Sequence, residues 1–151
     1  MSAVYTRIAT LADLDTIAPV FDAYRQFYEQ PSDMVAARHF IRARLQNNES
    51  IIIVASTEAQ PVVGFCQLYP TFCSVEAKPI YSLYDLFVIP EARRLGIGTV
   101  LLKSAENTAR ANGKARMDLT TAKINKPAQA VYESLGWVRD EVFYAYSKSI
   151  S

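Results

Sequence analysis

The sequence has 151 residues, of which 50% are hydrophobic and 21% charged, a balance typical of a folded chain and too short for two ordinary domains. We therefore predict a single domain over residues 1–151. Sixteen lysine and arginine residues against fifteen aspartate and glutamate residues leave a formal net charge of +1, which argues against a nucleic-acid partner.

The sequence indicates neither a secretory signal nor a membrane span. Its first residues, MSAVYTRIATLADLD, lack the apolar core of a signal peptide, and no apolar run approaches the length that spans a bilayer. We therefore expect a cytoplasmic protein with no membrane partner. Cys66 and Cys73 are expected to be reduced thiols, and with the lone His39 they cannot build a metal cluster, so no metal site is expected.

The first part of the chain predicts one strand followed by two helices. Residues 3–10 (AVYTRIAT) alternate as a strand does, and Thr10 with Asp13 forms a capping-box signal for a helix. Apolar residues at three- and four-residue spacings give that helix one buried face, namely Leu14, Ile17, Phe21, Tyr24 and Tyr28. Ser32 is the predicted N-cap of a second helix over residues 34–48.

Strands dominate the middle of the chain. The β-branched and aromatic runs at residues 50–57 and 62–72 predict two antiparallel strands, and residues 80–90 predict a third. A glycine turn and a helix closed by Gly113 follow. The run at residues 115–122 then predicts a strand that a strand-helix-strand crossover places parallel to the previous one.

The end of the chain predicts a short helix and terminal strands. Asn125 is the expected N-cap of this helix and Gly136 its end, and residues 137–150 have the aromatic and β-branched content of strands. The segment 141–150 could pair across subunits, which would make the protein a homodimer, or could form an ordinary sheet edge.

The glycine turn reads RRLGIG at residues 93–98. A dinucleotide fingerprint needs a third glycine and a P-loop needs a lysine directly after the last glycine, and the sequence has neither. Gly96 and Gly98 allow successive backbone N–H groups to point into one concavity at a helix N-terminus, and Arg93 and Arg94 add positive charge. The turn is therefore either an anion-binding nest or a plain strand-to-helix turn.

Two motifs together resemble the GNAT superfamily of N-acetyltransferases. RRLGIG matches its [QR]-x-x-G-x-[GA] signature, and NKPAQAVYESLGW at residues 125–137 is similar to its second block. The whole chain resembles the α/β fold of that family, a mixed and mostly antiparallel sheet splayed between two central parallel strands, with flanking helices. Within the family, the chain looks most like the subgroup of histone and polyamine acetyltransferases.

The resemblance implies acetyl-CoA as cosubstrate, with no metal. Its pantetheine would pair with the main chain of Leu86 and Val88, and its pyrophosphate would bind the backbone amides of residues 93–99. Asn125 would contact the cofactor and Tyr132 would lie near its sulfur. The implied cofactor-binding residues are Leu86, Val88, Arg93, Arg94, Leu95, Gly96, Ile97, Gly98, Thr99, Asn125, Ala128 and Tyr132.

The implied reaction is acetyl transfer to a primary amine by direct attack in a ternary complex. Tyr132 is the candidate acid that protonates the departing thiolate, or else an ordinary core tyrosine. Some members of the family carry a glutamate base on the strand before the turn, but here Ser82 and Tyr84 occupy the expected positions. Asp85 is the nearest carboxylate, either as the base or in a structural pairing, and a β-bulge could decide where it points.

Tyr28, Glu29 and Tyr84 are the candidate acceptor-binding residues, because aromatic faces with a carboxylate suit a cationic amine. The acceptor is then a small polyamine-like molecule or a peptide lysine. The alternatives are an amino acid or antibiotic amine as acceptor, and a noncatalytic acyl-CoA-binding sensor or interaction module.

Overall fold

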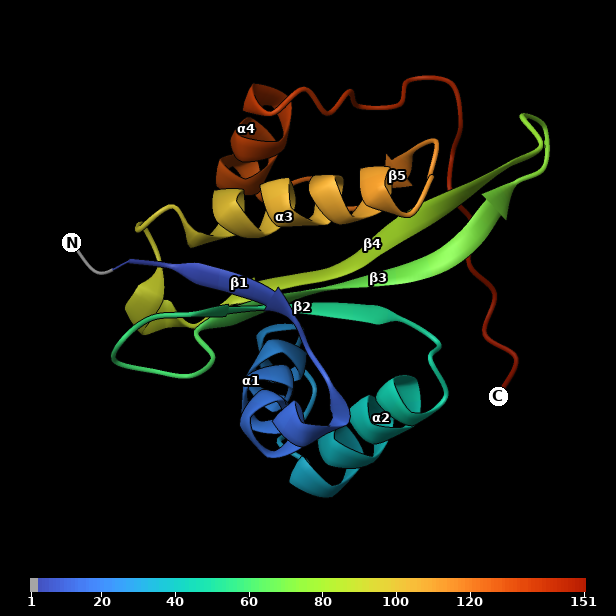
Figure 1. The fold of residues 1–151 in the computed structure, drawn as a ribbon. Helices are drawn as coiled ribbons and strands as arrows, with labels where there is room; N and C mark the ends of the chain where they lie inside the picture. Colours follow the sequence, from blue (N-terminus) through green and yellow to red (C-terminus); the bar gives the residue numbers. More distant parts are fainter. Residues whose placement is uncertain (1–2) are drawn as a thin grey trace. The chain divides into compact units, whose positions relative to one another are not determined.

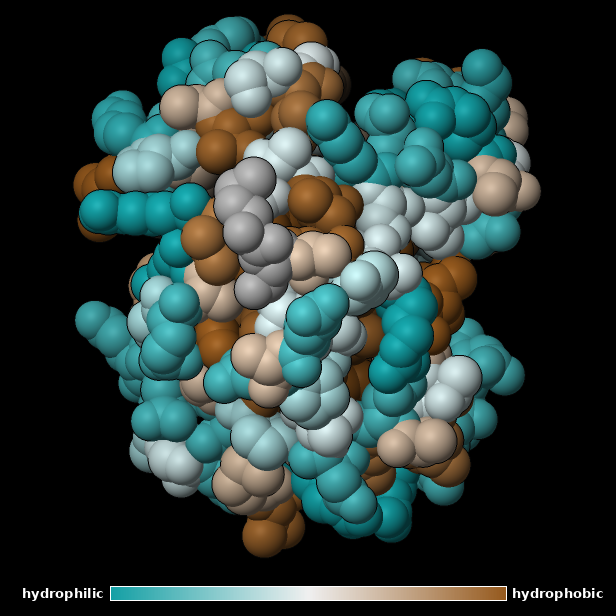
Figure 2. Space-filling model, turned by 60° about the vertical axis from the view of Figure 1, so that its left-hand side comes forward, coloured by the Kyte–Doolittle hydropathy of each residue, from teal (hydrophilic) through white to brown (hydrophobic). Residues whose placement is uncertain are grey.

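The structure is a computed structural model that describes residues 3–151 and forms two compact units. The first ends at Leu119 and the second begins at Thr120. Among the described residues, no helix is long and apolar enough to cross a membrane. On the face shown in Figure 2, apolar side chains lie in small groups among hydrophilic ones, without one large apolar patch.

The first unit is built on a five-stranded sheet with the order β1-β2-β3-β4-β5 (Figure 1). The strands are β1 (Tyr5–Ile8), β2 (Ile51–Ser56), β3 (Gly64–Cys73), β4 (Lys78–Val88) and β5 (Met117–Asp118). The first four pair antiparallel, and β4 pairs with β5 in parallel. This confirms the predicted mixed, mostly antiparallel sheet and the parallel crossover.

Helices cover both faces of this sheet (Figure 1). A 3-10 turn, η1 (Leu11–Asp13), leads into α1 (Leu14–Phe27), and α1 and α2 (Met34–Gln46) lie against one face. A second 3-10 turn, η2 (Pro90–Ala92), precedes α3 (Ile97–Ala111) on the other face. Of the predicted apolar stripe on α1, Leu14, Ile17 and Phe21 are buried, whereas Tyr24 is half-buried and Tyr28 is exposed. The other two helices bury Ala37 and Ile41 on α2, and Ile97, Leu101, Ala105 and Ala109 on α3.

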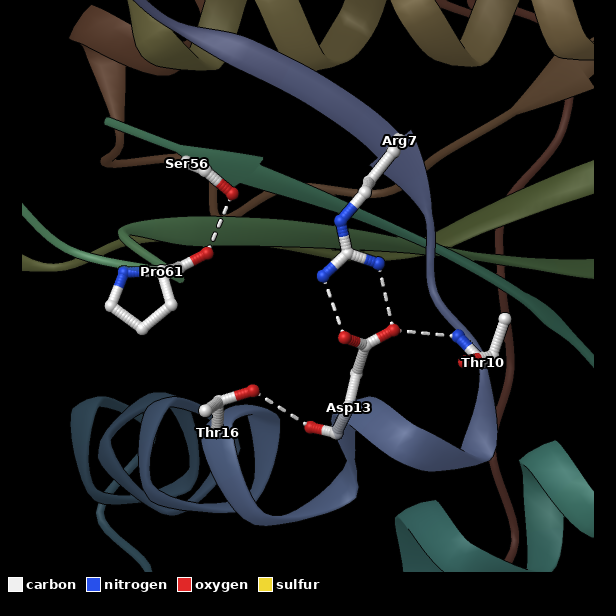
Figure 3. Close-up of polar contacts among 6 residues, drawn as sticks. All are labelled: Arg7, Thr10, Asp13, Thr16, Ser56 and Pro61. Carbon is white, nitrogen blue, oxygen red and sulfur yellow. Dashed lines mark hydrogen bonds and ion pairs between the residues drawn. The ribbon is translucent and has the colours of Figure 1, made fainter. Parts of the chain in front are cut away.

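The start of α1 is tied to β1 by an ion pair. The Arg7 guanidinium donates to both carboxylate oxygens of Asp13, at 2.8 and 2.6 Å, and Asp13 Oδ2 also accepts the Thr10 N–H at 2.8 Å (Figure 3). The bonds from Arg7, with a smaller contribution from Thr10, lower the pKa of Asp13. The predicted Thr10 and Asp13 signal therefore marks a real helix start, and the bidentate pair fixes where the sheet meets the helix.

The predicted N-cap of α2 is wrong by one residue. Asp33 caps the helix, because its Oδ1 accepts the Ala36 N–H at 3.0 Å. Ser32 instead donates its hydroxyl to Asp22 on α1 at 2.7 Å, and the Asp33 N–H donates to the same carboxylate at 2.8 Å. A buried carboxylate is costly unless it is hydrogen-bonded, so Asp22 takes the hydroxyl that would otherwise cap the helix.

The second unit contains α4 (Lys126–Ser134), capped as predicted by Asn125, whose Oδ1 accepts the Ala128 N–H at 3.3 Å. Gly136, with a φ of 91°, follows the end of the helix.

The predicted terminal strands are wrong, because residues 137–151 form no strand. The Asp140 carboxylate accepts the N–H groups of Val142 and Phe143, at 3.2 and 2.9 Å, and this local turn takes two donors that a strand would need. The strand predicted over residues 115–122 is also shorter, at Met117–Asp118, and it lies at the edge of the described sheet instead of its centre.

Candidate active site

A β-bulge in β4 determines which main-chain groups are exposed along this strand. Gln67 lies opposite Asp85 and Leu68 opposite Leu83, so Tyr84 has no partner on β3.

The bulge changes the direction of the alternating main-chain groups. Before it, the Tyr81 N–H donates to Arg116 next to β5, and after β4 the Ile89 N–H donates to Val63 next to β3. Because main-chain groups alternate along a strand, Leu86 and Val88 direct theirs away from β3. Pairing with β5 covers β4 only at Tyr81 and Ser82. The strand edge predicted to pair with pantetheine is thus unpaired in the described sheet.

The turn at residues 93–98 contains two left-handed residues. Arg94 and Gly96 both have left-handed conformations, with φ values of 66° and 75°, on either side of Leu95. The first intrahelical bond of α3 runs from the Val100 N–H to the Gly96 carbonyl. The N–H groups of residues 97–99 therefore have no acceptor within the helix, and a Cβ added at Gly98 would meet nothing within 4 Å. These donors and this space fit a phosphate group.

Arg93 does not simply extend into solvent beside this turn. Its Nε donates to the Val88 carbonyl at 2.9 Å, and its guanidinium carbon lies 5.6 Å from the centre of the Phe27 ring and 5.4 Å from that of Phe87. The Val88 carbonyl, predicted to pair with pantetheine, thus already accepts a bond from Arg93. A carbonyl oxygen has a second lone pair, so a ligand could share it or displace the arginine.

Asp85 is buried at the bulge, with 7% of its surface exposed. Gln67 Nε2 donates to its Oδ2 at 2.7 Å. Burial raises the pKa of the Asp85 carboxyl, while hydrogen bonding with Tyr24 and Gln67 opposes that rise. The sequence singles out Asp85, and the structure adds that it is a buried carboxyl of raised pKa, the environment in which a carboxylate is a stronger base.

Tyrosines surround this carboxyl. The Tyr24 and Tyr69 hydroxyls interact electrostatically with Asp85, and Tyr84 interacts with both of these tyrosines. Burial is the main cause that raises the pKa of Tyr69 to about 12. The Tyr28 ring packs edge-on against Tyr24 at 5.3 Å, and the Tyr84 ring packs edge-on against Tyr69 at 5.6 Å. Because Tyr28 and Tyr84 are exposed, they form the outer part of an aromatic wall beside Asp85.

Glu29 is the one candidate acceptor residue that the described contacts do not bring to Asp85. It lies in the exposed turn after α1, with a φ of 66°, and its N–H donates to the Gln26 carbonyl at 3.0 Å. Gln67 and Tyr69, by contrast, were missed by sequence reasoning. The sequence feature that could have indicated them is their two-residue spacing from Phe65 along β3, which places all three side chains on one face of the strand.

The second motif forms the N-cap and body of α4. The Asn125 side-chain oxygen Oδ1 accepts the Ala128 N–H, so the NH₂ group of the side chain is the part left for a ligand. The Tyr132 ring lies 6.2 Å from the Trp137 ring, and the Trp137 N–H donates to the Tyr132 carbonyl at 3.0 Å. Within residues 3–151, no group of three or more His, Cys, Asp or Glu side chains could hold a metal ion.

Residues 17–137 match the acetyltransferase (GNAT) family, and the chain belongs to it. It is 44% identical over 144 residues to an uncharacterized N-acetyltransferase of Bacillus subtilis (strain 168), YhfO, covering 95% of this chain and 96% of that one. The crystal structure of a probable acetyltransferase is 40% identical, with a TM-score of 0.88 and coverage of 99% and 98%.

A more distant relative has a named acceptor. Aminoglycoside N(6')-acetyltransferase type 1 of Acinetobacter genomosp. 13 is 25% identical over 109 residues, which cover 70% of this chain and 75% of that one. Together these relationships make the protein an acetyltransferase.

Proposed function

We propose that the protein transfers the acetyl group of acetyl-CoA to a primary amine by direct attack, with Asp85 as the general base. The observation that carries this proposal is the buried Asp85 carboxyl beside an unpaired strand edge and an aromatic wall. Acetyl-CoA supplies the acetyl group as a thioester. The turn at residues 93–99 would hold its pyrophosphate, and the main chain of Leu86 and Val88 would bind its pantetheine.

A base is needed because amines are protonated at neutral pH. An amine with a pKa of about 10.4 requires about 4.6 kcal/mol to lose its proton at pH 7. The ionised Asp85 carboxylate attracts the ammonium group and accepts its proton, directly or through water. The N–H groups at Leu86 and Val88 would then stabilise negative charge on the thioester oxygen.

The carboxyl group and the aromatic rings of the wall support an amine as the acceptor. Tyr24, Tyr28, Tyr69 and Tyr84 present aromatic faces and hydroxyl groups near one buried carboxyl. A small polyamine-like amine or a peptide lysine suits such a site, since aromatic faces and a carboxylate both attract an ammonium group. An amino acid or an antibiotic amine is the second candidate acceptor, favoured by the similarity to the aminoglycoside enzyme.

The proposal is tested first by heating the purified protein with acetyl-CoA, with AMP and with no ligand. A ligand at a hundredfold excess over its Kd adds about 2.7 kcal/mol to the free energy of unfolding, which raises Tm by roughly 5–10 °C for this size. We expect this shift with acetyl-CoA only, and amine-dependent release of free CoA when polyamines and lysine peptides are added.

Each component of the experiment has its own contrary result. No Tm shift with acetyl-CoA would refute the nest at residues 93–99. A shift without thiol release for any amine class would leave the sensor alternative in place of the enzyme.

Tyr132→Phe tests the proposed general acid. We expect kcat to fall about tenfold to a thousandfold, because the departing thiolate loses its proton donor, while the acetyl-CoA Kd stays within twofold. Steady-state kinetics and ligand titration measure the two separately. Unchanged kcat would assign Tyr132 only to the packing of α4, where its ring meets Trp137.

A further inference from the structure

Gln67 is an unexpected residue for the centre of a sheet. It is fully buried, between Cys66 and Leu68, which are buried as well. A buried amide is unfavourable unless its donors and acceptor are hydrogen-bonded, so an apolar residue would suit this strand better. Its presence therefore calls for a reason other than packing.

The hydrogen bonds of Gln67 fix the direction of its amide. The Ser50 hydroxyl donates to Gln67 Oε1 at 2.7 Å, and Gln67 Nε2 donates to Asp85 Oδ2 at 2.7 Å. Because the amide oxygen already accepts from Ser50, its NH₂ group is the one that faces the carboxylate. The chain Ser50, Gln67, Asp85 thus holds Oδ2 of the carboxylate, and Tyr24 also hydrogen-bonds to this carboxyl group.

We propose that Gln67, oriented by Ser50, is a positioning residue for acetyl transfer that aims the Asp85 carboxylate at the acceptor amine and favours its ionised form. This inference rests on the proposed role of Asp85 as the base. A purely structural role for the Gln67 and Asp85 pair is less consistent with the sheet. β3 and β4 already pair on both sides of the bulge, and two apolar residues here would avoid the desolvation of a carboxylate.

The groups that interact with Asp85 come from two elements. Tyr24 on α1 and Gln67 on β3 both hydrogen-bond to its carboxyl group, and Cys66 and Tyr69 on β3 interact with it electrostatically. The pKa of the Cys66 thiol is raised to about 12, chiefly by burial, so Cys66 is neutral near pH 7.

Gln67→Met tests the proposal, since methionine keeps the length of the side chain and removes the donor. We expect kcat/KM for the amine to fall about tenfold to a hundredfold, the effect of one hydrogen bond to a charged group. The acidic limb of the kcat/KM profile should move to higher pH, because the ionised carboxylate loses a donor that favours it. The acetyl-CoA Kd should not change.

Gln26→Met is the matched control. Gln26 also donates to a buried carboxylate, that of Asp22 at 3.0 Å, but outside the site, so this variant should leave the pH profile unchanged. If Gln67→Met does not fold, Ser50→Ala and Ser50→Thr test the positioning role instead. The alanine variant should move the acidic limb in the same direction by a smaller amount, and threonine, which keeps the hydroxyl, should restore it.

A folded Gln67→Met variant with an unmoved acidic limb would overturn the positioning role. If Gln67→Met does not fold, an unchanged acidic limb in Ser50→Ala would overturn the positioning role as well. Asp85→Asn separates this failure from failure of the proposed base. If Asp85→Asn keeps the wild-type pH profile of kcat/KM, the base assignment itself is wrong. If Asp85→Asn loses the acidic limb of this profile while Gln67→Met keeps the wild-type profile, only the positioning role is rejected.

Discussion

Asp85→Asn is expected to abolish most amine acetylation while making the folded protein more stable at neutral pH. The amide cannot accept the proton of the acceptor, and loss of a general base lowers turnover by about 10²–10⁴-fold. The same change removes the unfavourable burial of a negative charge, since burial raises the pKa of the Asp85 carboxyl above its ordinary value of 3.8. Activity and stability should therefore change in opposite directions.

The sign of the stability effect follows from proton binding. A carboxyl of raised pKa keeps its proton in the folded state at pH values where the unfolded chain has already lost it. Wild-type stability therefore decreases as pH rises through this window. The asparagine variant lacks this decrease, so its advantage should be present at pH 7 and disappear at low pH, where Asp85 is protonated in both states.

Thermal unfolding from pH 3 to 8, combined with a thiol-release assay, measures both effects. A gain of about 1 kcal/mol would raise Tm by roughly 2–4 °C in a chain of this size. Asp22→Asn is the control, because hydrogen bonds from Asp33 and Ser32 lower the pKa of this other buried carboxyl. It should lose stability at pH 7, lose less as pH falls, and keep its activity. Wild-type turnover in Asp85→Asn would remove Asp85 from the mechanism.

Local patterns predicted the fold well wherever a short segment determines its own structure. Leu14, Ile17 and Phe21 are buried as expected, and Asn125 and Gly136 bound α4 as predicted. The terminal strands failed because strand-forming residues need a partner, whereas Asp140 offers the following N–H groups a local acceptor. Residue propensity alone does not show whether strand pairing or the local hydrogen bonds to Asp140 will form.

The candidate site was predictable only in part, because some of its contacts are local and others depend on how two strands pair. The turn at residues 93–98 is local, so its glycine spacing predicted the strand-to-helix turn, and the anion nest there stays a prediction. The contact of Gln67 with Asp85 depends on the register between β3 and β4, and that register shifts at the bulge opposite Gln67 and Leu68. A single sequence contains no local signal for such a shift, so Gln67 and Tyr69 could not be placed beside Asp85 in advance.

Gly98→Glu should weaken acetyl-CoA binding without weakening the fold. Gly98 lies in the first turn of α3, lacks a left-handed φ, and has open space where a Cβ would lie. Glutamate is a better helix former than glycine, and a negative charge near a helix N-terminus is stabilising, so the Tm without ligand should stay level or rise by about 1–4 °C.

The same carboxylate would repel the pyrophosphate that the nest is proposed to hold. We expect the Kd and KM for acetyl-CoA to rise about tenfold to a hundredfold, with a smaller effect at high salt, where charges are screened. Isothermal titration at two salt concentrations measures this.

Two variants at the same position separate charge from size. Gly98→Gln, of equal length but uncharged, should lose less affinity and show little salt dependence, and Gly98→Ala should bind nearly as well as the wild type, because the [GA] position of the motif accepts alanine. If Gly98→Glu binds acetyl-CoA with wild-type affinity, the N–H groups of residues 97–99 do not hold the pyrophosphate. The two left-handed residues, Arg94 and Gly96, would then serve only to turn the chain from β4 into α3.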